Sequence, residues 1–237
     1  STVKKVSMEL GGHAPFIVFD DADIDEAVSG AMTTKFRNTG QTCICANRLF
    51  VHEKIYDEFL EKFSSAVSKI KVGDGFENDV TAGPLIDEIS LNKVKEQVID
   101  AVKTGAKIAV GGDVHQLGGN FYQPTVLSNV TTKAKITYEE TFGPVAPIYK
   151  FSTEKEVIKM ANDSPYGLAS YFYSRDIGKI WRVAEALDYG MVGVNTGIIS
   201  KAEAPFGGVK ESGLGREGSK YGLEDFLEIK YINIAGI

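Results

Sequence analysis

The chain has 237 residues, of which 43% are hydrophobic and 24% are charged, and its formal net charge is −6. This is the composition of an ordinary globular protein, and its acidic balance argues against a nucleic-acid partner, because binding to a phosphate backbone needs a basic face. No apolar run approaches the roughly 20 residues that span a bilayer and no signal sequence opens the chain, so we expect no membrane partner and a cytoplasmic location.

The first part of the chain alternates short apolar runs with stretches of helical periodicity. Asp23, followed three residues later by Glu26, forms the capping box of a helix. A later stretch places its apolar side chains on one stripe at helical spacing. The elements predicted here are strands at 4–10 and 15–19, a helix from Asp23 to residue 36, a strand at 48–52 and a helix within 53–72.

The same alternation continues through the middle of the chain. A helix with apolar positions from Leu91 to Val102 ends before Gly105, a suitable C-terminal cap, and Thr153 with Glu156 forms a second capping box. Strand and helix signals then follow at 107–110, 153–162, 169–173, 177–187 and 191–195. This order predicts an α/β fold with a largely parallel sheet and flanking helices.

The amino-acid composition changes in the last part of the chain. Six glycines fall within the sixteen residues from Gly207 to Gly222, a density that predicts a long loop without regular elements. Residues 228–234 then alternate as a strand does, and a lone strand must pair outside its own hairpin. We therefore expect a partner subunit, as in a homodimer or homotetramer, or another domain.

Only two cysteines occur, Cys43 and Cys45, within the segment KFRNTGQTCICANR. Two thiols this close do not make the disulfide framework of a secreted protein, so a reducing compartment is expected. A loop cysteine becomes a nucleophile only where positive potential or backbone donors favour the thiolate. Taken without context, the two cysteines are better interpreted as small buried packing residues.

The three histidines limit the remaining chemistry. His13, His52 and His115 show no ligand-pair spacing, so no metal site is predicted. None of them lies in a motif that would make it the base of a thiol hydrolase beside Cys43. A phosphate-binding GxGxxG or Walker motif is also absent from the sequence.

Four segments occur in an order that resembles the aldehyde dehydrogenase superfamily. They are MELGG at residues 8–12, GQTC at 40–43, EETFGPV at 139–145 and PFGGVKESGLGREGSKYG at 205–222. The resemblance extends from residue 1 to residue 237 and implies an NAD- or NADP-dependent oxidoreductase. In that family a dinucleotide-binding domain precedes the MELGG strand and carries most of the cofactor site, so the preference between NAD and NADP is not readable here.

The resemblance also implies roles for individual residues. Cys43 resembles the family's nucleophile, Glu9 its general base, and Glu140 and Phe142 its contacts to the nicotinamide riboside. Without the motifs, Glu9 would be interpreted as a solvated acid at a strand end and Glu140 as one of two adjacent surface acids. The pair Gly11 and Gly12 is expected to allow a tight turn beside Glu9.

The resemblance further implies a domain organisation. Residues 1–10 would be the terminal strand of a dinucleotide-binding domain that is missing here, and residues 11–207 a catalytic domain. Residues 208–237 would form a glycine-rich loop and an oligomerisation strand. On its own, the chain is expected to be inactive in oxidation and to self-associate.

The residues near the nucleophile suggest an aldehyde with a second functional group. Arg37 lies six positions before Cys43, and a guanidinium suits a carboxylate. The segment resembles succinate-semialdehyde dehydrogenases, which implies that Arg37 and Ser200 of GIIS bind the substrate carboxylate; glutarate semialdehyde is the alternative. Arg37 could instead be a cation that complements a helix C-terminus. For Cys45 the resemblance suggests a strained redox disulfide with Cys43, and the alternative is a packing residue.

Overall fold

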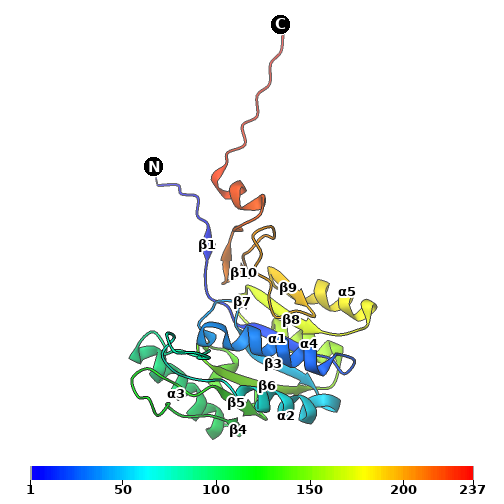
Figure 1. The fold of residues 1–237 in the computed structure, drawn as a ribbon. Coiled ribbons are helices and arrows are strands. Elements are labelled where there is room, and N and C mark those ends of the chain that lie inside the picture. Colours follow the sequence, from blue (N-terminus) through cyan, green and yellow to red (C-terminus); the bar gives the residue numbers. More distant parts are fainter. Residues whose placement is uncertain (1, 237) are drawn as a thin grey trace.

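Residues 2–236, which the computed structural model describes, contain a central seven-stranded sheet of order β4-β5-β6-β3-β2-β8-β9 (Figure 1). All neighbouring strands are parallel except β4, which runs antiparallel to β5 at one edge. The strands are β2 (Ala14–Val18), β3 (Ala46–His52), β4 (Lys107–Val110), β5 (Thr125–Ser128), β6 (Val145–Phe151), β8 (Ala169–Tyr173) and β9 (Met191–Val194). The predicted fold class is confirmed.

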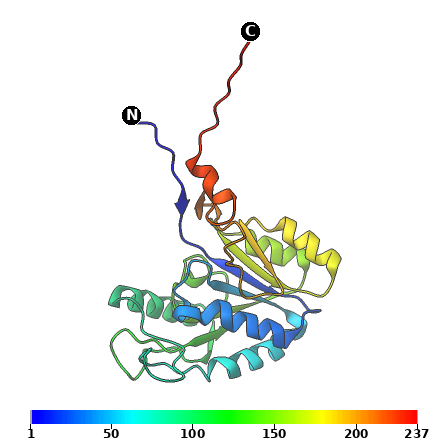
Figure 2. The ribbon, with the colours of Figure 1, turned by 45° about the horizontal axis from the view of Figure 1, so that its top comes forward.

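Helices cover both faces of this sheet (Figures 1 and 2). Helices α1 (Ile24–Phe36) and α2 (Tyr56–Val67) pack on the face to which Phe16 and Val18 point. Helices α3 (Glu88–Lys103), α4 (Glu154–Asn162) and α5 (Ile177–Ala186) pack on the face to which Ile17 and Phe19 point. Successive side chains of a strand point to opposite faces, so the continuous apolar run of β2 is buried on both sides.

The helix starts follow the capping signals of the sequence. The Asp23 carboxylate accepts the backbone N–H groups of Asp25 and Glu26 at 3.1 and 3.2 Å, and the Thr153 hydroxyl accepts that of Glu156 at 3.2 Å. These bonds satisfy donors that the first helical turn leaves free. Within residues 2–236 no helix has the length and apolar character needed to span a membrane.

Several predicted boundaries were wrong. The helix predicted within residues 53–72 begins as the 3-10 turn η2 (Glu53–Ile55), continues as α2 and ends at Val67. Strands β5 and β6 were not predicted. β6 contains Pro147 although it lies between two other strands, and an internal proline argues against a strand when only the sequence is known.

The two ends of the described chain leave the body side by side (Figures 1 and 2). Strand β1 (Met8–Glu9) pairs antiparallel with β11 (Gly213–Leu214), so the strand predicted at 4–10 is only two residues long. The glycine-rich segment is not a plain loop, because it also contains β10 (Val209–Lys210), paired with β7 (Tyr166–Gly167), and the 3-10 helix η4 (Tyr221–Phe226).

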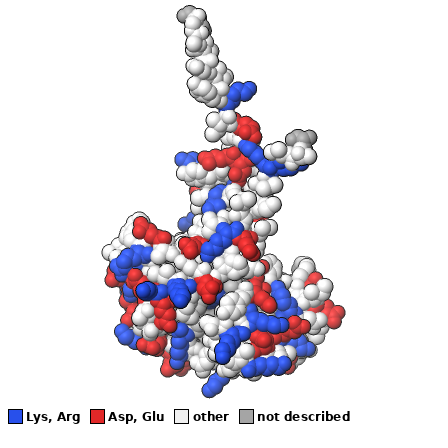
Figure 3. Space-filling model, turned by 180° about the vertical axis from the view of Figure 1, so that it is seen from behind, with Lys and Arg blue, Asp and Glu red and all other residues white. Residues whose placement is uncertain are grey.

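The strand predicted at residues 228–234 is absent from the part of the chain that the structure describes. The segment is extended and exposed, with Ile229 100% and Tyr231 85% accessible. Seen from behind, the far end of this tail presents an uncharged surface (Figure 3). A strand needs a neighbouring edge for its backbone hydrogen bonds, and no edge of the described chain lies beside this segment.

Candidate active site

The predicted catalytic residues meet at the amino ends of adjacent parallel strands. Glu9 and Gly12 lie on the segment that leads into β2, Cys43 lies on the loop that leads into β3, and Glu140 precedes β6. Open parallel sheets more often bind ligands at the carboxyl ends of their strands. Here the candidate residues lie at the amino ends of the strands instead. Three irregular segments converge at that edge, and the sequence motifs lie on those segments.

The nucleophile loop begins with a left-handed turn after α1. Asn38, Thr39 and Gly40 have φ angles of 50°, 58° and 75°, a conformation that is unfavourable for a β-branched residue such as Thr39. The Thr39 hydroxyl compensates by bonding to both the N–H and the carbonyl oxygen of Gly83, at 3.0 and 3.3 Å. The turn is therefore fixed by a neighbouring loop before the chain reaches Cys43.

Gly12 connects three of the sequence motifs. Its N–H donates to a carboxylate oxygen of Glu140 at 2.9 Å. A Cβ at this position would lie 2.1 Å from the carbonyl oxygen of Cys43. The glycine is thus needed for close approach of two backbones, whereas we had expected it to serve a tight turn.

The Cys43 thiol and the Glu9 carboxylate lie close enough for each to shift the pKa of the other. The Cys43 side chain is half-buried, and its pKa is raised to about 11, first by desolvation and then by the negative charge of Glu9. The backbone N–H groups of Cys43 and Ile44 lower this pKa, but they do not outweigh the raising effects. Backbone donors are therefore present as expected, yet the thiol is protonated near neutral pH and needs a base to become a nucleophile.

Glu9 is placed to be that base. Partial desolvation raises the pKa of its carboxyl group, the charge of Glu217 raises it further, and the hydrogen bond from Cys43 lowers it. A carboxyl pKa shifted upwards makes a stronger base at neutral pH. Glu217 belongs to the glycine-rich segment, and nothing in the sequence pattern indicated that it would act on Glu9.

Glu140 and Phe142 lie on the loop that leads into β6. Desolvation raises the pKa of Glu140, and the hydrogen bond from Gly12 opposes this. Phe142 is half-buried and has a φ of 50°, which is uncommon outside glycine and indicates a constrained loop. Their contact with a nicotinamide riboside stays a prediction.

Cys45 lies beneath the nucleophile loop and is fully buried. Its sulfur lies 3.3 Å from the ammonium nitrogen of Lys35, which is also fully buried and donates to the side-chain oxygen of Asn47 at 2.9 Å. Burial raises the pKa of Cys45 and lowers that of Lys35. Both cysteines are free thiols. These contacts favour the packing role, and the redox disulfide stays a prediction.

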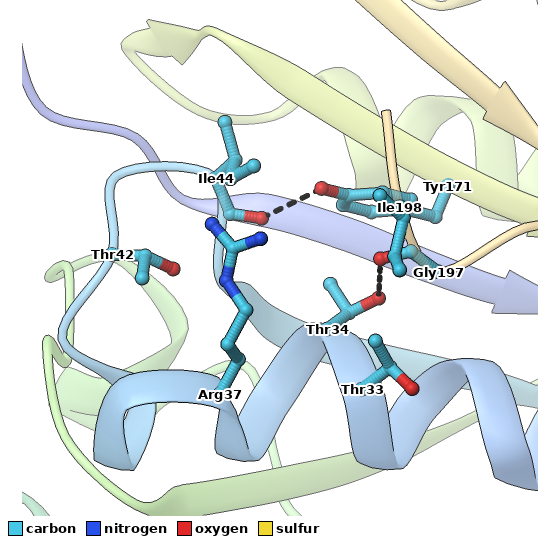
Figure 4. A pocket seen from close by; sticks show the side chains of 8 residues that line it. All are labelled: Thr33, Thr34, Arg37, Thr42, Ile44, Tyr171, Gly197 and Ile198. Carbon is cyan, nitrogen blue, oxygen red and sulfur yellow. Dashed lines mark hydrogen bonds between the residues drawn. The ribbon is translucent and has the colours of Figure 1, made fainter. Parts of the chain in front are cut away.

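Arg37 points into a narrow pocket beside the nucleophile loop (Figure 4). The Tyr171 hydroxyl donates to the carbonyl oxygen of Ile44 at 2.9 Å, and the Thr34 hydroxyl donates to that of Gly197 at 2.8 Å. The second bond brings the segment with GIIS against α1. The lining residues are Thr33, Thr34, Arg37, Thr42, Ile44, Tyr171, Gly197 and Ile198. Ser200 is exposed and is not among them, so its role also stays a prediction.

A thiol close to a carboxylate, with a guanidinium in the adjoining pocket, is an arrangement typical of enzymes that use a thiol nucleophile. The model of the aldehyde dehydrogenase family matches residues 1–232. The chain belongs to this family.

Three relatives whose names specify a substrate are similar to this chain. The succinate-semialdehyde dehydrogenase (NADP(+)) of Escherichia coli K12 is 61% identical over 232 residues, 98% of this chain and 48% of that protein. A 3-sulfolactaldehyde dehydrogenase of Pseudomonas putida is 61% identical over 236 residues, 100% of this chain and 49% of that protein. A glutarate-semialdehyde dehydrogenase of Pseudomonas aeruginosa is 59% identical over 235 residues, with coverages of 99% and 49%.

Solved structures of relatives share the fold of this chain. The crystal structure of a succinate-semialdehyde dehydrogenase from Burkholderia pseudomallei superposes with a TM-score of 0.96 at 58% identity, covering 98% of this chain and 48% of that one. The chain thus spans about half the length of the relatives that it matches.

Proposed function

We propose that the chain supplies the nucleophile, the general base and part of the substrate pocket for NAD(P)-dependent oxidation of a short anionic aldehyde. Succinate semialdehyde is the first candidate and glutarate semialdehyde the alternative. The observation that carries the proposal is the closeness of the Cys43 thiol and the Glu9 carboxylate, each of which shifts the pKa of the other, beside the pocket of Arg37. The three relatives above are named for succinate semialdehyde, 3-sulfolactaldehyde and glutarate semialdehyde, and each of these aldehydes bears an anionic group.

The first half-reaction uses the thiol. Glu9 accepts the Cys43 proton, and the thiolate adds to the aldehyde carbon. The carbonyl oxygen becomes an alkoxide, for which the Cys43 backbone N–H is a candidate donor. A nicotinamide ring, when bound, would accept the hydride that leaves the former aldehyde carbon, and a thioester remains on Cys43.

The second half-reaction uses the carboxylate again. Glu9 first releases to solvent the proton that it took from Cys43. The carboxylate then removes a proton from a water molecule, and the resulting hydroxide attacks the thioester carbon. The C–S bond breaks, the carboxylic acid is released and the thiol takes up a proton. The upward shift of the Glu9 pKa supports this role, because the carboxylate is then a stronger base.

The described residues fit part of a nicotinamide cofactor. One oxygen of the Glu140 carboxylate accepts the Gly12 N–H, whereas no hydrogen bond within residues 2–236 engages the other oxygen. A carboxylate with a free lone pair can accept a ribose hydroxyl. We propose that Glu140, with Phe142 beside it, holds the riboside in a full-length enzyme, meaning a protein of the relatives' length that contains these residues.

We expect Arg37→Ala in the full-length enzyme to raise KM for succinate semialdehyde far more than for butanal, which lacks the carboxylate. Losing a charge-assisted bond to a buried carboxylate costs on the order of 2–5 kcal/mol, a factor of tens to thousands in kcat/KM. Initial rates with both aldehydes measure the difference.

Arg175→Ala is the matched control for Arg37→Ala. It removes an exposed arginine whose partner is Asp23, at the opposite ends of the strands, and both aldehydes should be oxidised as before. Parallel losses on succinate semialdehyde and butanal in Arg37→Ala would reduce Arg37 to a structural residue and remove the case for an anionic substrate.

We propose that the chain self-associates through its C-terminal tail, giving a homodimer or homotetramer. The extended segment 228–234 and the outer edge of β9 each leave backbone groups without a strand partner in the described chain. Light scattering of the 237-residue chain should give at least twice the monomer mass, and a form ending at residue 226 should be monomeric. The chain should produce no NAD(P)H. Equal monomer masses for both forms would contradict the proposal.

A further inference from the structure

Tyr171 is a feature of the pocket that the motifs did not indicate. It lies on β8 in the middle of its strand, is fully buried, and turns its phenol towards the nucleophile loop (Figure 4). Its hydroxyl donates to the carbonyl oxygen of Ile44, the residue after Cys43, at 2.9 Å. A buried hydroxyl bonded to a backbone carbonyl fixes that peptide in one orientation.

The phenol is affected by both groups that a substrate would contact. Burial raises the pKa of Tyr171, a negative charge on Cys45 would raise it further, the positive charge of Arg37 lowers it, and a negative charge on Cys43 would raise it. The hydroxyl is therefore neutral and a donor at all ordinary pH values. Since both Arg37 and Cys43 act on it, Tyr171 lies within electrostatic range of the nucleophile and of the substrate cation.

The wall of the pocket that carries Arg37 is held by contacts that do not involve Tyr171. Arg37 follows α1 directly, and the same helix is tied to the GIIS segment by the bond from Thr34 to Gly197. The nucleophile loop meets this wall through Tyr171, which comes from a central strand. Sites supported by strands hold their groups more precisely than sites supported by loops.

We propose that Tyr171 is a specificity-determining, positioning residue, which holds the nucleophile loop at a fixed distance from Arg37 and so selects the length of the anionic aldehyde. The inference rests on the proposed roles of Cys43 and Arg37. An aldehyde whose carbonyl carbon and anionic group match this distance is held at both ends, whereas one methylene more or less misplaces the carbonyl at Cys43.

The test compares succinate and glutarate semialdehydes, which differ by one methylene, in the full-length enzyme. Tyr171→Phe keeps the ring and removes the bond to Ile44, and the discrimination in kcat/KM between the two aldehydes should fall about three- to tenfold. Tyr173→Phe is the matched control, because Tyr173 is also buried, faces the same side of the sheet from β8 and lies outside the pocket. The discrimination of Tyr173→Phe between the two aldehydes should equal that of the parent enzyme.

Tyr171→Leu provides a second variant, because it also lacks the hydroxyl and it shortens the side chain that lines the pocket. Its discrimination should fall at least as far, and circular dichroism identifies which variants are folded. A parental ratio of the two kcat/KM values in a folded Tyr171 variant, or an equal change in Tyr173→Phe, would overturn the inference. If Arg37→Ala separates succinate semialdehyde from butanal and the Tyr171 variants keep the parental ratio, the inference fails while the proposed function stands.

Discussion

Cys43→Ala in the full-length enzyme should lose oxidation of succinate semialdehyde by on the order of 10⁴-fold or more, while the protein keeps its fold. The thiol forms the covalent bond to the substrate, and no other group can replace it in that step. The side chain is only half-buried, so removing its sulfur should cost about 1 kcal/mol of stability or less. Initial rates of NAD(P)H formation and a thermal melt measure the two effects.

Cys45→Ala is the matched control, because it removes a second thiol from the same loop. This change leaves the buried Lys35 ammonium with only Asn47 as a side-chain partner, so it should reduce stability more than Cys43→Ala does. It should nevertheless retain most of the activity. If Cys43→Ala oxidised the aldehyde at near the parental rate, or if Cys45→Ala lost activity to the same extent, Cys43 would not be the nucleophile.

The regular parts of the fold could be predicted because they depend on local signals. Asp23 and Thr153 cap their helices through side chains that bond within three residues, and such contacts are visible in sequence. β6 was missed because an internal proline is unusual in a strand that has neighbours on both sides. The strand predicted at 228–234 did not form because pairing needs an edge that the described chain does not place there.

The site was predictable to a different extent. The motif residues Glu9, Cys43 and Glu140 converge in the structure, whereas their energetics could not be predicted and their roles stay predictions. A nucleophilic role calls for surroundings that favour the thiolate, whereas burial and the charge of Glu9 raise the Cys43 pKa. Contacts from distant segments, such as those of Glu217 and Tyr171, have no local sequence signal because they arise only when the sheet and the glycine-rich segment are assembled.

Glu9→Gln in the full-length enzyme should slow steady-state turnover about 10²- to 10⁴-fold through the loss of a general base. Thioester hydrolysis needs a deprotonated water, and glutamine cannot accept its proton. The first turnover can proceed once the thiol ionises, so a burst of NAD(P)H should precede a slow steady state. Rapid mixing with succinate semialdehyde measures both phases. Equal loss of the burst and of the steady-state rate would contradict this prediction, because the substitution would then limit the first half-reaction or folding and not thioester hydrolysis.

We expect Glu9→Gln to have the opposite effect on the reactivity of the Cys43 thiol. The substitution that slows turnover in the full-length enzyme should speed alkylation of the thiol in the 237-residue chain without cofactor. Removing the Glu9 charge takes away an effect that raises the Cys43 pKa, so this pKa should fall below its value of about 11. At pH 9 more thiolate is then present, about tenfold more for each unit of the decrease, and iodoacetamide should alkylate Cys43 faster in Glu9→Gln. Glu26→Gln, which removes an exposed carboxylate on α1, should leave the rate unchanged. Unchanged or slower alkylation in Glu9→Gln would show that the carboxylate does not act on the thiol, and the pairing on which the proposed chemistry depends would be wrong.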